Sequence, residues 1–114
     1  MWHLFHRFHH VDIDIWVVPV CGLVAHRGHE AAVGFCYATD EHQAVARVRA
    51  QMGRDGREFV DLLERVHAMP PAHWADYVRH GWSGIEHRLP DADAVREPAA
   101  LRRVWFTPWM PFVP

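Results

Sequence analysis

Residues 11–52 read VDIDIWVVPVCGLVAHRGHEAAVGFCYATDEHQAVARVRAQM, and this stretch decides the fold. From residue 11 to residue 18, apolar β-prone side chains recur at every second position, which is typical of a half-buried strand. A turn sequence follows at 26–29, and a second apolar run spans 31–37. Two such runs joined by a glycine-containing turn predict a β-hairpin.

Two hairpin registers fit the turn. A loop of Arg27 and Gly28 would suit a type I′ turn, and a loop of Gly28 and His29 would suit a type II′ turn. The second register places Cys21 opposite Cys36. Both registers put one apolar set on the same face of the hairpin: Val20, Val24, Val33, Phe35 and Tyr37.

A helix is predicted directly after the second strand. Asp40 can cap its first turn, and Gln43 lies three residues later, in an arrangement close to a capping box. Apolar residues then recur on one side at positions 44, 45, 48 and 52, and Gly53 is suited to end the helix. The core unit 11–52 should therefore pack this helix against the hairpin.

The later segments add weaker signals. Apolar residues at helical spacing predict a second helix over about 58–68, and Pro71 can begin a third over about 72–80. Residues 102–106 are the candidate neighbour for the N-terminal part of the first strand, and 105–114 form an extended apolar tail. The 114 residues suit a single α+β domain over 1–114, with an antiparallel sheet of three to four strands and two to three helices packed on one face.

Composition excludes some partners. The formal net charge is −2 at pH 7, so no overall positive field favours nucleic acid. Apolar runs fall short of the roughly 20 residues that a membrane helix needs. The first seven residues lack the continuous apolar core of a secretory signal, and the chain has two cysteines. We therefore expect a cytoplasmic protein that binds neither nucleic acid nor membrane.

The eleven histidines raise the alternative of a metal site. His26 and His29 crowd the predicted hairpin tip, and Cys21 and Cys36 are neighbours in one register. Zinc needs three or four such ligands converging in a tetrahedron, and no C-x-x-C or H-E-x-x-H spacing is present. We therefore expect no cofactor, with a His-rich module that binds zinc or another transition metal as the alternative.

A second alternative is a small-ligand enzyme. Asp12 and Asp14 project from one face of the predicted first strand, so their carboxylates would lie close together and could act with histidines. A solvated strand face explains the same two carboxylates without chemistry, because charges commonly protect an exposed edge. No catalytic residue is therefore assigned.

The tail carries too many large apolar side chains for a free terminus in water. Either it folds back and seals the core, or it docks on a partner or a second copy of the chain. The predicted partner-binding residues are Trp105, Trp109, Met110 and Phe112. The sequence favours a small non-catalytic bacterial protein that binds other proteins, of the accessory, adaptor or immunity kind, and that self-associates as a homodimer.

Overall fold

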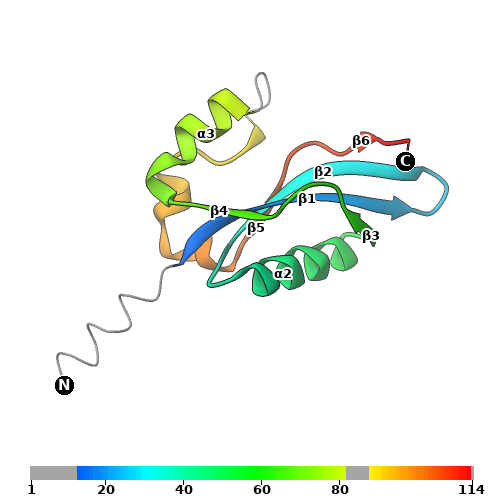
Figure 1. The fold of residues 1–114 in the computed structure, drawn as a ribbon, viewed down its shortest axis with the longest axis horizontal. Coiled ribbons are helices and arrows are strands. Elements are labelled where there is room, and N and C mark those ends of the chain that lie inside the picture. The colour runs from blue at the N-terminus through cyan, green and yellow to red at the C-terminus, as the bar shows by residue number, and fades with distance from the viewer. Residues whose placement is uncertain (1–12, 82–87, 114) are drawn as a thin grey trace.

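The computed structural model describes residues 13–81 and 88–113 (Figure 1). The sequence alternates strands and helices in an α+β arrangement. The strands are β1 (Asp14–Val24), β2 (Gly28–Ala38), β3 (Glu58–Leu62), β4 (His67–Met69), β5 (Val104–Phe106) and β6 (Met110–Pro111), and the helices are α2 (Glu41–Arg54) and α3 (Trp74–Gly81). Short 3-10 turns lie at Pro71–His73, Ala94–Arg96 and Pro98–Arg102.

The strands form one antiparallel sheet around the β1–β2 hairpin. β3 and β4 pair with the outer edge of β1, and β5 and β6 pair with the outer edge of β2. The predicted α+β class and antiparallel sheet are confirmed. The same-chain segment 104–106, predicted from this chain or a second copy as neighbour of the first strand, pairs instead with β2, and β4 lies beside β1 with Ile15 opposite Met69. Residues 1–12 lie outside the described range.

Both predicted hairpin registers are wrong. Val24 pairs with Gly28, so the loop has three residues, and the N–H of Arg27 donates to the carbonyl of Val24 at 3.0 Å. Inside this loop His26 adopts a left-handed φ of 73°. A third loop residue reverses the parity of the pairing, so Val20 lies opposite Ala32 and not on the face of Phe35 and Tyr37.

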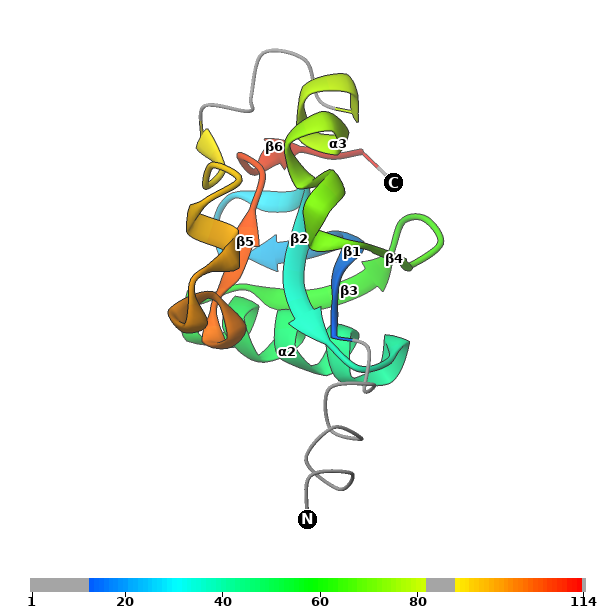
Figure 2. The same ribbon diagram turned by 90° about the vertical axis from the view of Figure 1, so that its left-hand side faces the viewer.

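The sheet carries a separate apolar core on each face. Under α2 lie even-numbered hairpin residues such as Val18, Val20 and Cys36, packed against Ala44, Val48 and Met52. On the other face the odd-numbered residues Ile15, Val17, Phe35 and Tyr37 pack against Trp74 and Val78 of α3 and against Val95. Figures 1 and 2 show the two helices on opposite sides of the sheet. The prediction that the helices share one face is therefore wrong.

The start of α2 follows the sequence signal. An Asp40 carboxylate oxygen accepts from the N–H of Gln43 at 2.8 Å, and the Gln43 side-chain oxygen accepts from the N–H of Thr39 at 2.8 Å. These bonds satisfy backbone donors that the first turn of a helix leaves unpaired. The end of α2 differs, since the helix continues to Arg54 and Gly56, not Gly53, takes the left-handed conformation, with φ of 80°.

The helix predicted over 58–68 is absent, and this segment forms β3 and β4. Phe59 and Leu62 pack toward α2 as strand residues, with a register shift in the ladder between Cys21 and Gly22. The backbone groups on the outer edge of the buried β1 need partners, and this demand outweighs the helical spacing of the apolar residues. The helix predicted over 72–80 corresponds to α3, preceded by the turn Pro71–His73.

Replacing Asp40 with alanine should lower the free energy of unfolding by about 1 kcal/mol, because the N–H of Gln43 loses its acceptor. The measurement is urea-induced unfolding. The neighbouring residue His42 provides the control, since its side chain is exposed and His42→Ala should change stability by less than about 0.5 kcal/mol. Equal losses in both variants would contradict the capping role.

Candidate functional site

The face of the sheet that carries α3 is open toward the hairpin tip, where it holds a groove of about 330 Å³. Val17, Pro19 and Val33 form part of its floor. Side chains from the β3–β4 segment and α3, including His67 and Tyr77, line the groove together with the tail residues Thr107, Pro108 and Met110. The lining is mostly apolar, which is typical of sites that bind apolar groups.

Hydrogen bonds fix the tail along β2. The N–H of Thr107 donates to the carbonyl of Val33 at 3.0 Å, and the N–H of Val33 donates to the hydroxyl of Thr107 at 2.9 Å. Further along, the N–H of Phe112 donates to the carbonyl of His29 at 2.9 Å. Pro108 and Pro111 lack N–H donors, so they limit pairing of another strand at this edge.

Trp109 anchors the tail on the opposite face of the sheet, in the α2 core. Its ring lies 5.2 Å from that of Phe106, and the Arg57 guanidinium stacks 4.2 Å from its centroid. Arg57 also forms a 2.9 Å ion pair with Glu30, and these two side chains are 16% and 12% exposed. Stacking and ion pairing by one guanidinium therefore join the tail, the hairpin and the α2–β3 turn.

The four predicted partner-binding residues occupy different environments. Trp105 packs in the α3 core against Tyr37 and Trp74, at centroid distances of 6.4 and 6.1 Å. Trp109 lies in the α2 core, and Phe112 is half-buried. Met110 is 65% exposed and lines the groove. The tail thus packs on the sheet, and of these four residues Met110 alone lines the groove.

One end of the groove is polar. Nε2 of His67 in β4 lies 3.1 Å from the hydroxyl of Tyr77 in α3, and Glu64 lines the groove beside them. Burial raises the pKa of the Tyr77 phenol above its ordinary value, and the nearby Glu64 carboxylate raises it further. The phenol therefore keeps its proton at neutral pH. Glu64 and His67 lie in the segment for which the sequence predicts a helix, so the sequence did not indicate that they meet Tyr77 of α3.

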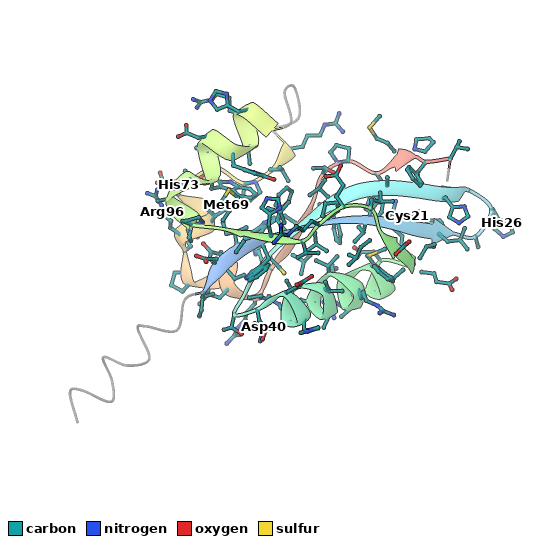
Figure 3. The ribbon with its side chains drawn as sticks, in the orientation of Figure 1. Cys21, His26, Asp40, Met69, His73 and Arg96 are labelled. Carbon is teal, nitrogen blue, oxygen red and sulfur yellow. The ribbon has the colours of Figure 1, made fainter. Side chains whose placement is uncertain are left out.

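The structure does not bring the candidate metal ligands together. Cys21 pairs with Ala31 and Cys36 with Trp16, so the two buried thiols are not cross-strand neighbours, and that prediction is wrong. His26 lies at the hairpin tip (Figure 3). His29 is half-buried in β2. Within residues 13–81 and 88–113, no three His, Cys, Asp or Glu side chains form a group that could hold a metal ion.

Of the two carboxylates in the enzyme alternative, one lies in the described part of the chain. Asp14 is half-buried at the start of β1, opposite Ala38, whereas Asp12 lies outside the described residues.

Comparisons with protein-family models, curated proteins and solved structures find no match for this chain. In the described part of the chain, neither helix has the length and apolar character needed to span a bilayer. The groove is therefore interpreted from its own chemistry.

The thiol of Cys36 should make stability depend on alkaline pH. Burial raises its pKa from 9.0 to about 11, although Arg47 lowers it slightly. Above pH 9 the unfolded chain releases this proton while the folded chain retains it. The contribution is therefore complete below pH 9 and is lost as pH rises through 11, by roughly 3 kcal/mol in all.

Urea unfolding between pH 8 and 10.5 tests this, with Cys36→Ala for comparison. The variant leaves a small cavity and should be less stable at every pH. The comparison therefore uses the slope of the free energy of unfolding against pH, and not its absolute value. We expect a shallower fall in stability with pH for Cys36→Ala. Identical slopes in the two proteins would show that this thiol does not titrate as its burial predicts.

Substitutions at two adjacent tail residues distinguish a packed side chain that anchors the tail from one that is mostly exposed. Trp109→Ala removes the ring between Phe106 and Arg57 and should cost about 2 kcal/mol of stability. Met110→Ala removes a mostly exposed side chain and should cost less than about 0.5 kcal/mol. Thermal and urea unfolding measure both effects. A Trp109→Ala protein as stable as Met110→Ala would mean that the tail is not held by this anchor.

Proposed function

We propose that this chain is a non-catalytic binding protein that engages a segment of a partner protein in the groove between α3 and the C-terminal tail. The observation that carries the proposal is an open apolar groove on the sheet, with the 65% exposed side chain of Met110 at its rim. Apolar depressions of this kind on a protein surface are typical of interaction sites, and flexible methionines adapt to different apolar partners.

The dimensions of the groove suit part of a peptide. Its volume of about 330 Å³ lies at the lower end of the range for ligand sites, with room for one or two apolar side chains. The walls are already in place, because Thr107 and Val33 exchange two hydrogen bonds and His67 contacts Tyr77. A preformed groove reduces the entropy lost on binding, which favours affinity from a small contact area.

The proposed binding function is that of a cytoplasmic accessory or adaptor protein, which recognises another protein and catalyses no reaction. A second copy of the chain is included among the partners, since Met110 at the rim is a side chain that one copy can offer to the groove of the other. An isologous dimer of this kind would use the same groove twice. Experiments therefore need a variant in which the groove alone is closed.

Ala31→Trp is that variant. Ala31 is half-buried in β2 and lines the groove, so an indole at this position should fill it, and tryptophan is well tolerated in strands. Ala46→Trp is the matched control, because Ala46 is exposed on α2, which packs on the opposite face. Unfolding measurements on both variants establish that they remain folded.

A displayed library of random peptides is selected on the wild-type protein, and the selected peptides are then titrated against all three proteins. We expect Ala31→Trp to weaken binding at least about tenfold, a difference of about 1.4 kcal/mol, with Ala46→Trp unchanged. Native mass spectrometry of the same proteins reports whether closing the groove also dissociates a dimer. Selected peptides that bind Ala31→Trp as well as wild type would overturn the proposal.

A further inference from the structure

The polar end of the groove presents hydrogen-bond acceptors. Nδ1 of His67 lies 3.5 Å from the carbonyl oxygen of Arg65, and the neutral tautomer with its proton on Nδ1 can donate to this carbonyl. Nε2 then carries a lone pair and accepts from the hydroxyl of Tyr77 at 3.1 Å. In this tautomer the phenol donates its single proton to Nε2, so toward any further group it acts only as an acceptor.

The charge at this end is negative. Among the described residues that line the groove, with histidine counted as neutral, Glu64 is the ionised one. Asp61 provides a second carboxylate on the same side. Cys21 follows Pro19 on the groove face of β1, and the pKa of its thiol is raised mainly by burial and also by the nearby Asp61. The adjacent Arg65 lines a separate depression with Trp16 and Glu41. The local field therefore favours a cation over an anion.

We infer that the groove recognises a partner segment in which an apolar side chain is followed by a basic one, lysine or arginine. The apolar group lies over Val17, Pro19 and Val33, and the cation meets the Glu64 carboxylate at the polar end. A lysine or arginine side chain has donors and no acceptor, which complements a site that offers acceptors. This inference rests on the proposed binding function and specifies the partner's chemistry.

Three short probes that differ in one side chain test the preference. Acetyl-Leu-Arg-amide, acetyl-Leu-Gln-amide and acetyl-Leu-Glu-amide are titrated into the full chain, and backbone amide shifts of groove residues are followed by NMR. We expect the arginine probe to bind about three- to fivefold more tightly than the glutamine probe, and the glutamate probe to bind most weakly. The preference should shrink as salt is added, because screening weakens partly exposed charge pairs.

Glu64→Gln keeps the shape of the side chain and removes its charge, so it should abolish the preference for arginine over glutamine. Glu97→Gln is the control, since Glu97 is an exposed carboxylate between the two late 3-10 turns and does not line the groove. This variant should retain the full preference. A preference that persists in Glu64→Gln would overturn the assigned role of Glu64.

The outcomes separate this inference from the function on which it rests. Equal binding of the three probes in the groove, or tighter binding of the glutamate probe, overturns the preference for a basic side chain and leaves the binding function intact. Absence of groove shifts with every probe also overturns the inference. If library selection yields no groove-dependent peptides either, the proposed function fails with it.

Discussion

The burial of β1 on both faces is the constraint on which the rest of the structure depends. Ile15, Val17, Val18 and Val20 are at most 1% exposed, although they alternate between the two faces. Such a strand needs hydrogen-bond partners along both edges and an apolar layer over both faces. β2 provides one edge and β3 with β4 the other, while α2 and α3 provide the layers. Most of the chain therefore serves to enclose one strand.

The C-terminal tail meets the same requirement for β2, and in doing so it builds the groove. β5 and β6 pair with the outer edge of β2, and the tail places Trp105 in one core and Trp109 in the other. Side chains on both faces of the sheet hold the tail, so it cannot leave without exposing apolar surface on each side. The wall that contains Met110 is therefore held by side chains in both cores.

Features that depend on a few adjacent residues were predicted correctly from the sequence. Features that depend on pairing between distant segments were not. The cap at Asp40, the helix near Trp74 and the extended tail follow from a few adjacent residues, and the structure contains each of them. The hairpin register depends on His26 adopting a positive φ, which is uncommon for residues other than glycine, so the sequence did not single out this position. The segment 58–68 has helical spacing, but the open edge of β1 converts it into strands.

The same misassignment hid the polar end of the site, because a helix over 58–68 would have turned Glu64 toward solvent. The groove itself follows from a difference in length. An eight-residue α3 extends about 12 Å at 1.5 Å per residue, whereas the eleven residues of β1 extend about 36 Å at 3.3 Å per residue. The helix and the nearby 3-10 turns cover the part of the sheet around Ile15 and Tyr37, and the face near Pro19 and Val33 stays open. Among the described residues, the short α3 therefore leaves this part of the face without a helix over it, and this uncovered part is the groove that we propose as the binding site.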